Sequence, residues 1–525
     1  MEKDILLYDT TLRDGAQTAG ISLTVEDKAK IARHLDDIGM DYIEGGWPAP
    51  GNKTDIEFFR RMAEEKLSHA KLVAFGMTRR PRMAADQDPQ VRSLLSAGVG
   101  TVCIVGKSWD LHVTDALRIG LEQNLSMIED TVRFFKSQGL EVIFDAEHFF
   151  DGFRRNSAHA LATLEAAQTG GADTVVLCDT NGGSLPDQIV SGVEAANEAL
   201  RVRLGIHTHN DGELAVANTL AAVSCGATHV QGTVNGYGER CGNANLCSII
   251  PNLQLKLGKR CLPKRSLSKL YSLSHYVAEV ANQVPLEQQP YVGRSAFAHK
   301  GGLHVDGVLK RPDTYEHIPP EAVGNQRRLL VSDQAGGSAV VFKAKNLEID
   351  LTKESPQTAQ ILSALKEMEH EGYQFEGAEA SFELLVKKLT GQHKKKFDLE
   401  GFRVIVEKYG EQEPHSEATV RLTAGSSREY TAAEGDGPVH ALDLALRKAL
   451  EKFYPELARV KLKDFKVRVI EGKEGTGAKV RVLIESSDGA DSWSTVGVHS
   501  NIIEASWRAL IDSIEYALAA RKRAA

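Results

Sequence analysis

The sequence predicts an α/β protein built on a (β/α)₈ TIM barrel, with helical linker subdomains and a C-terminal α+β domain. The main observation is an alternation of short apolar segments with amphipathic helical patterns, which occurs eight times within residues 1–264. Strands that alternate with helices indicate a parallel sheet, and eight units at this length favour closure into a barrel. The candidate strands are 4–8, 41–47, 71–75, 101–105, 141–147, 173–179, 202–207 and 228–233. A doubly wound open sheet is the alternative, but the first candidate strand lacks the phosphate-binding loop expected there.

The helical segments carry their own start signals. Thr24 precedes the first of them, and Asp27 follows three residues later, which is a capping-box pattern. A single apolar face comes next, formed by Val25, Ala29, Ala32 and Leu35. Residues 1–264 are therefore expected to form one barrel domain.

The alternation is lost in residues 265–392. Helical patterns at 266–282 and 355–370 flank a loop rich in glycine and histidine, AFAHKGGLHVDG, and we predict helical linker subdomains here. The stretch GQHKKKF then predicts a hinge. Its lysines are typical of a solvated linker and do not indicate a nucleic-acid site.

Residues 393–525 contain an internal repeat. Strand patterns at 401–408, 416–423 and 427–434 precede a helix at 438–453, and the order recurs at 464–471, 478–486, 492–498 and 501–521. A βββα unit cannot bury its sheet alone, so the two copies are expected to pack together about a pseudo-dyad. The segment has no cluster of catalytic residue types, so we expect it to bind a ligand or to form a dimer.

Composition and charge exclude several classes of function. A net charge of −8 and an isoelectric point near 6.1 argue against binding to nucleic acid or to an anionic membrane. No apolar run reaches the length of a membrane span, and the charged N-terminus does not resemble a signal peptide. The six cysteines form no CxxC pair, which is typical of reduced thiols. We therefore expect a cytoplasmic enzyme.

Two histidines at the end of the seventh candidate strand are the strongest sign of chemistry. His207 and His209 lie two residues apart in GIHTHND, so both side chains point to the same face of the strand and can reach one metal ion. Two hydrogen-bonded core histidines would give the same pattern. Here, however, the pair lies at the C-terminal end of a barrel strand, where barrel active sites form.

Other polar residues follow the remaining strands at the same end of the barrel. Each could be a helix cap, a loop ion pair or a turn residue, but a whole ring at one end favours an active site. These residues are Arg13, Asp14, Glu44, Glu147, Thr180, Asn235, Arg240 and Asn243.

The ligand types in this ring favour a metal with open coordination positions. Two imidazoles with a carboxylate and an amide oxygen suit Mg²⁺, Mn²⁺, Co²⁺ or Zn²⁺, and not a closed structural zinc site. Such an ion can chelate a 2-oxo acid and polarise its carbonyl for attack. Arg13, next to Asp14, is suitably placed to stabilise the resulting oxyanion.

Three motifs resemble the family of 2-isopropylmalate, homocitrate and citramalate synthases. LRDGAQTAGISLTVEDK is similar to the family's LRDGxQ signature and includes Lys28, and HTHND and NGYGERCGNANL are similar to its second and third motifs. The resemblance continues through the loop with His304 into the C-terminal repeat. One departure follows the histidine pair, where the family's HxHNDxG becomes NDGE, with Gly212 early and Glu213 in the glycine's place.

The resemblance implies a Claisen-type condensation of acetyl-CoA with a 2-oxo acid, followed by thioester hydrolysis. It implies that a divalent metal is held by Asp14, His207, His209 and Asn243. Arg13 would contact the carbonyl of the 2-oxo acid, Thr180 its carboxylate, and Glu147 would lie near the reacting carbons. His304 would help to remove the methyl proton of the acetyl group, and it would come from the partner subunit of a homodimer. Tyr315 would belong to the substrate-binding residues.

The segment IEGGWPAPGNKTDIEFF resembles that of the citramalate enzymes of this family, which predicts pyruvate as the acceptor. The alternatives are 2-isopropylmalate synthesis from 2-oxoisovalerate, a lyase of the same barrel superfamily, an amidohydrolase-type enzyme, and a regulator that only senses a metabolite. An amidohydrolase would carry its histidine pair on the first strand. By resemblance, the C-terminal domain would be a feedback sensor for isoleucine.

Overall fold

A computed structural model describes residues 3–330, 337–346, 349, 351–352, 354–375, 377–470 and 477–520. The chain divides into two compact units. The first comprises Met1–Phe297 with His317–Arg327, and the second comprises Ala298–Glu316 with Arg328–Ala525. The predicted domain limits at 264/265 and 392/393 stay predictions. None of the described helices is long and apolar enough to cross a membrane.

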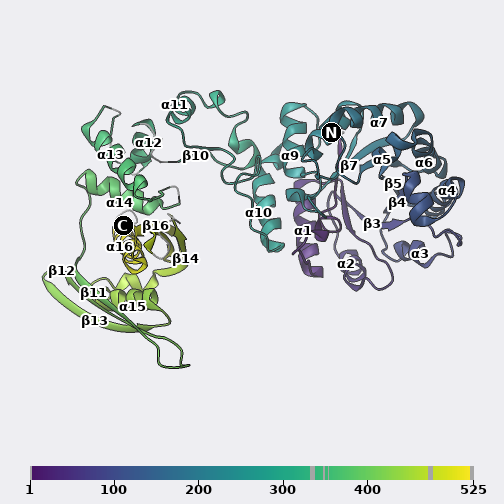
Figure 1. Cartoon of the computed structure of the whole chain (residues 1–525). Helices are drawn as coiled ribbons and strands as arrows, with labels where there is room; N and C mark the ends of the chain where they lie inside the picture. The colour runs from purple at the N-terminus through teal and green to yellow at the C-terminus, as the bar shows by residue number, and fades with distance from the viewer. Residues whose placement is uncertain are drawn as a thin grey trace. The chain divides into compact units, whose positions relative to one another are not determined.

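The first unit is a closed barrel of parallel strands, as the sequence predicted (Figure 1). Strand β1 pairs with both β2 and β8, and this closes the sheet. The strands are β1 (Leu6–Asp9), β2 (Tyr42–Gly46), β3 (Lys71–Met77), β4 (Thr101–Lys107), β5 (Glu141–Glu147), β6 (Thr174–Asp179), β7 (Arg203–Thr208) and β8 (His229–Gly232). The polar residues of the predicted ring therefore follow strand ends that meet at one mouth.

Helices alternate with these strands and surround the barrel. They are α1 (Val25–Ile38), α2 (Lys53–Ala63), α3 (Pro89–Leu95), α4 (Leu121–Ser137), α5 (Phe149–Arg155), α6 (Ser157–Gly170), α7 (Pro186–Ala199), α8 (Ala215–Ser224), α9 (Leu246–Pro251) and α10 (Leu270–Val280). Short helical turns are η1 (Gly15–Gln17), η2 (His112–Leu117), η3 (Val234–Gly236), η4 (Asn252–Lys256), η5 (Lys264–Lys269) and η7 (Pro320–Val323). The predicted cap at Thr24 is confirmed, because its side chain and that of Asp27 form a capping box.

Side chains alternate between two cores along each barrel strand. Leu7 points outward and packs in the large core between strands and helices, whereas Tyr8 points into the barrel. The interior cluster consists of Tyr8, Tyr42, Val73, Phe75, Cys103, Ile143, Val176 and Cys178. Because this interior is filled, the barrel is a packed support and the site can form only at its mouth.

The second unit begins with a small parallel sheet that the sequence did not predict. Strands β9 (Ala298–His299) and β10 (Arg328–Leu329) pair over two residues. They are too short to show a period-two pattern, which explains why the sequence missed them. The helices of this part are α11 (Gly302–Lys310), η6 (Pro312–Thr314), α12 (Gly337–Asn346), α13 (Pro356–His370) and α14 (Glu379–Leu389).

The predicted C-terminal repeat is present. Strands β11 (Asp398–Glu407), β12 (His415–Ala424) and β13 (Ser427–Gly435) precede α15 (Pro438–Leu450). After η8 (Pro455–Arg459), β14 (Lys461–Val469), β15 (Val480–Ser487) and β16 (Ser492–His499) precede α16 (Ile502–Ala520). Equivalent hydrogen bonds join strand to helix in each copy, from Thr431 to the Ala445 carbonyl and from Thr495 to the Ala509 carbonyl. Side chains of both copies share one buried cluster.

Candidate metal and substrate site

Three candidate metal ligands lie together at the mouth of the barrel. Asp14 follows β1, and His207 and His209 come from the end of β7. Asp14 Oδ2 lies 3.5 Å from His207 Nε2 and 4.0 Å from His209 Nε2, and the two Nε2 atoms are 3.3 Å apart. All three residues are buried, and their ligand atoms lie within 4.8 Å of one another.

A chain of hydrogen bonds orients the first imidazole. Nδ1 of His207 lies 2.8 Å from Oε1 of Gln231, whose Nε2 donates to Asp145 at 2.9 Å. Since the amide nitrogen is used by Asp145, the amide oxygen faces the ring and Nδ1 must donate its proton to it. Nε2 of His207 then carries a lone pair directed toward Asp14 and His209.

The second imidazole is also prepared to act as a neutral ligand. Burial and the neighbouring His207 lower the pKa of His209 to about 3. The Nε2 atoms of the two imidazoles lie 3.3 Å apart beside a carboxylate, so all three groups can converge on one cation.

Asn243 is the fourth candidate ligand, and its backbone forms a β-bridge with that of His209. Its Nδ2 donates to the Tyr237 carbonyl at 3.3 Å, while its buried Oδ1 has no hydrogen-bond partner among the described residues. Gly238 allows this approach, because a Cβ there would lie 2.2 Å from the Asn243 amide nitrogen. The donor set of two neutral imidazoles, a carboxylate and an amide oxygen therefore fits a divalent cation.

Asp14 is held in its charged form. Burial by itself would raise the pKa of this carboxyl, but the charge of the adjacent Arg13 guanidinium opposes burial, and the pKa lies below its usual value. The carboxylate is thus available as a ligand at neutral pH.

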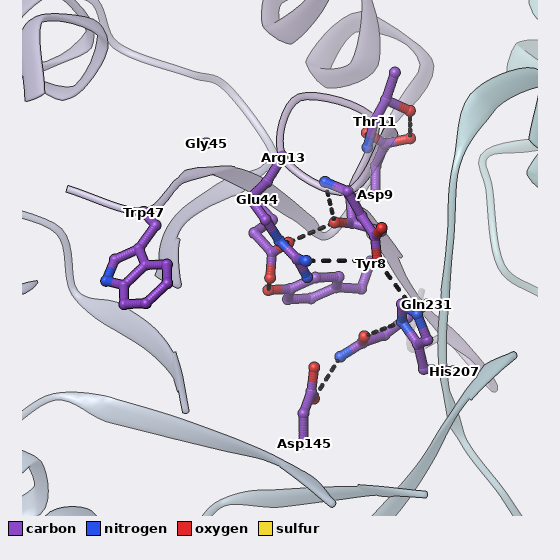
Figure 2. Close-up of polar contacts among 12 residues, drawn as sticks. Tyr8, Asp9, Thr11, Arg13, Glu44, Gly45, Trp47, Asp145, His207 and Gln231 are labelled. Atoms are coloured by element: carbon purple, nitrogen blue, oxygen red, sulfur yellow. Dashed lines mark hydrogen bonds and ion pairs between the residues drawn. The ribbon is translucent and has the colours of Figure 1, made fainter. Parts of the chain in front are cut away.

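Arg13 is fixed by three contacts at the mouth. Its Nε donates to Glu44 Oε1 at 2.6 Å, one terminal nitrogen lies 3.5 Å from Asp14, and its guanidinium lies 3.9 Å from the centre of the Phe75 ring. Glu44 is fully buried and also accepts hydrogen bonds from Tyr8 and Thr10. Glu44 therefore orients the arginine and is itself engaged from several sides (Figure 2).

Glu147 and Thr180 lie at the ends of neighbouring strands. Glu147 forms an ion pair with Lys107, the last residue of β4. Thr180 accepts a hydrogen bond from the His148 backbone at 2.9 Å through its hydroxyl oxygen. The sequence analysis missed Lys107. Its position could have indicated it, because it is a polar residue at the C-terminal end of a barrel strand, like the residues of the predicted ring.

A cavity of about 260 Å³ lies among the ends of these strands. One part of its wall is polar and contains Arg13, Asp14, Asp145, Glu147, Thr180, His207 and His209. The other part is mainly apolar and contains Trp47, Phe75, Met77, Val105 and Cys178. Its volume is slightly below the range of roughly 300–1,000 Å³ that is usual for ligand pockets, which favours a small ligand.

Two further residues of the predicted ring brace the loops. Arg240 makes a two-point ion pair with Asp211, at 2.8 and 2.9 Å, and donates to the Thr180 carbonyl. Asn235 bonds to Ser274 on α10. Glu213, the unusual residue in the NDGE stretch, adopts a φ of 60°, which lies in the left-handed region that favours glycine.

His304 and Tyr315 belong to the second compact unit, whereas the metal-ligand candidates belong to the first. Within their own unit the two rings stack at 4.2 Å between centroids, and both residues are exposed. Their assignment to catalysis and substrate binding stays a prediction.

Other participants were invisible to sequence reasoning. Gln231 lies on β8, next to β7, and Asp145 lies on β5; both point into the barrel, where Asp145 reaches Gln231 from a strand distant in the sheet order. Their strands also contain apolar residues typical of any barrel core. No local pattern could have identified them.

Three family models match most of the chain, one after another. A model described as HMGL-like matches residues 4–277, one described as homocitrate synthase post-HMGL domain-like matches 291–373, and one described as LeuA allosteric (dimerisation) domain matches 376–518. The first match corresponds to the barrel and the last to the repeat.

The sequence identity to relatives that match nearly the whole chain differs between citramalate synthases and 2-isopropylmalate synthases. The chain is 54% identical over 515 residues to an (R)-citramalate synthase of Geobacter sulfurreducens, covering 98% of this chain and 97% of that protein. It is 55% identical over 520 residues to an (R)-citramalate synthase of Aquifex aeolicus, covering 99% and 98%. Identity to a 2-isopropylmalate synthase of Methanocaldococcus jannaschii is 31% over 521 residues, covering 99% and 96%.

Proposed function

The chain belongs to the HMGL-like family, in its citramalate synthase group, and from this premise we propose that it condenses acetyl-CoA with pyruvate. Hydrolysis of the thioester then gives (R)-citramalate and CoA, a step of isoleucine biosynthesis. The observation that carries this proposal is the similarity of the whole chain to (R)-citramalate synthases, which far exceeds its similarity to 2-isopropylmalate synthases.

The metal site would be formed by Asp14, His207, His209 and Asn243. When bound, a divalent ion supplies Lewis acidity, which makes the carbonyl carbon of a 2-oxo acid more electrophilic. Pyruvate would lie in the cavity with its carboxylate near Thr180 and its methyl group toward the apolar wall.

Arg13 would stabilise the negative charge that develops on the carbonyl oxygen during attack. Glu44 binds Nε of this arginine and Asp14 lies 3.5 Å from one terminal nitrogen, so the guanidinium is held in place where it lines the cavity. A donor already fixed in position needs no reorganisation when the charge appears, and this is the physical basis of oxyanion stabilisation.

Proton transfer requires a positioned base, because the methyl group of a thioester is a weak acid. We assign this role to His304 of the partner subunit, with Glu147 as the acidic group near the reacting carbons. Tyr315, stacked on the His304 ring, would help to orient it and to bind substrate.

A mixing experiment tests the role of the dimer. Asp14→Ala and His304→Ala are each expected to be inactive alone. If His304 acts across the dimer, a random equal mixture should recover about a quarter of the wild-type activity, since half of the dimers contain one intact site. Mass spectrometry should first show that the subunits have exchanged. If the exchanged mixture still recovers no activity, this assignment is wrong.

The C-terminal repeat would bind isoleucine as a feedback inhibitor. A cavity of about 620 Å³ lies between α15 and the segment from η8 into β14, and its lining is mostly apolar. Buried Asp443 lines it; one carboxylate oxygen accepts from Arg447, and the other has no partner among the residues described. A carboxylate among mostly apolar side chains suits an ammonium group attached to an aliphatic chain.

Steady-state release of CoA, measured with pyruvate, 2-oxobutyrate and 2-oxoisovalerate, tests the main proposal. Pyruvate should give the highest kcat/KM, and chiral analysis should identify (R)-citramalate. A higher kcat/KM for 2-oxoisovalerate would replace the proposal with 2-isopropylmalate synthesis.

A further inference from the structure

A buried ion pair lies behind the substrate cavity and takes no part in the chemistry described above. Lys28 on α1 is 4% exposed and Asp55 on α2 is 7% exposed, and the Lys28 ammonium pairs with the Asp55 carboxylate. A buried ion pair contributes little net stability, because desolvation of both charges offsets their attraction. Its occurrence therefore suggests a role in positioning.

The pair binds both ends of the turn that leaves β2. Lys28 Nζ donates to the Gly45 carbonyl at 3.1 Å, while Asp55 Oδ2 accepts from the Trp47 backbone at 2.8 Å and from Asn52 at 2.7 Å. One ion pair thus fixes the backbone on either side of Gly46.

Gly46 is required at the centre of this arrangement. Its φ is 144°, which L side chains rarely adopt, and an added Cβ would lie 2.3 Å from the Asp55 carboxyl carbon. The register of β2 against β3 also shifts between Glu44 and Gly46. Such irregularities bend a strand and redirect the side chain that follows, which here is Trp47.

Both ends of the segment Glu44–Trp47 are connected to the substrate cavity. Glu44 holds Arg13 at one end, and at the other Trp47 lines the cavity and packs edge-on against Phe75, with ring centroids 6.2 Å apart. Figure 2 shows Glu44, Gly45 and Trp47 in order along this segment, with Arg13 beside Glu44. If the Lys28–Asp55 ion pair were lost, Trp47 in the apolar wall could therefore move relative to Arg13.

We propose that Lys28 and Asp55 are positioning residues that set the size of the acceptor by holding Trp47 in the apolar wall of the cavity. The inference rests on the proposed function, because it concerns which 2-oxo acid the same site accepts. When Trp47 is fixed, a 2-oxo acid with a longer side chain is excluded by steric overlap. When Trp47 can move, the enzyme loses part of its preference for the shorter acid.

Two variants and one control test the proposal in the full-length enzyme. Asp55→Asn keeps the shape of the side chain and removes its charge, and the double variant Lys28→Met with Asp55→Asn avoids leaving one buried charge unpaired. Arg33→Met is the control, because Arg33 also joins α1 to the end of α2, through Glu65 at 2.8 and 3.0 Å, and does not contact the turn.

Both test variants should lower the ratio of kcat/KM for pyruvate to that for 2-oxobutyrate by about fivefold or more. KM for acetyl-CoA and affinity for the metal should stay within about twofold of the wild type, and the control should keep the wild-type ratio. Hydrogen exchange should show loss of protection at the Trp47 amide in the test variants alone.

An unchanged selectivity ratio in both variants would overturn the proposal, even if both proteins melt at a lower temperature. Failure of the proposed function would look different. In that case the wild type would prefer another 2-oxo acid, and the ratio between that acid and its next longer homologue would then serve as the test.

Discussion

Nδ1 of His207 and Oε1 of Gln231 lie 2.8 Å apart, within the barrel and below the mouth where substrate would bind. This bond fixes both the tautomer and the orientation of the imidazole. It also continues to Asp145, whose pKa burial raises to about 6. The geometry of the metal site therefore depends on two residues that are not themselves candidate metal ligands.

Gln231→Leu should weaken metal binding by about 10–100-fold, because His207 loses the acceptor that holds its ring. Chelator competition or calorimetry of the apoenzyme measures this directly. Gln254→Leu is a suitable control, since Gln254 accepts a backbone hydrogen bond from Leu262 elsewhere in the barrel unit. Equal metal affinity in the two variants would show that the bond has no positioning role.

Arg13→Lys should lower kcat by about 10²-fold and raise KM for pyruvate far less. A lysine keeps the charge but cannot bind Glu44 and face the cavity with a planar fork at the same time. Arg79→Lys provides a control, because Arg79 also follows a barrel strand and bonds to a carboxylate, Asp130. A loss confined to KM would make Arg13 a binding residue only.

Asp14→Ala and His207→Ala should each abolish bound metal and CoA release while the melting temperature of the metal-free protein changes little. The reason is that the three side chains converge on one point, so removal of either leaves an incomplete ligand set. Chelation of the wild type should give the same loss, reversed by added divalent cation. Full activity in chelator would disprove the site.

The stability of the barrel should fall as pH rises from about 4 to about 7 through Asp9. Burial raises the pKa of this carboxyl from 3.8 to about 7. Between these values the folded state keeps a proton that the unfolded state has lost, so each rise in pH favours unfolding. The melting temperature of the wild type should therefore fall relative to that of Asp9→Asn as pH rises over this range. If the difference between the two melting temperatures stays constant, the pKa of Asp9 is not raised.

Asp443→Asn should raise the inhibition constant for isoleucine by about tenfold or more and leave kcat without inhibitor unchanged. The charged oxygen that would pair with the ammonium group is lost, whereas the cavity keeps its shape. Glu504→Gln is the control, because Glu504 makes a similar ion pair with Arg508 on α16. Inhibition by leucine and indifference to isoleucine would change the assigned pathway.

The sequence by itself determined the barrel, the C-terminal repeat and the identity of the side chains at the mouth. Periodicity is local, so eight strand and helix units could be identified in order, and their C-terminal ends had to meet once the sheet was parallel. The spacing of His207 and His209 placed both rings on one face for the same local reason.

Only the tertiary structure decided how these residues are held. Gln231 reaches His207 from a neighbouring strand, Asp145 reaches Gln231 from another part of the barrel, and Lys28 and Asp55 meet between two helices. Each of these contacts joins residues that are distant in sequence. The sequence around each partner is typical of a barrel strand or a surface helix and does not mark the residue. The sequence therefore revealed the groups that can do chemistry, because their type and spacing are local, while the positions of their supports depend on how the sheet closes and the helices pack.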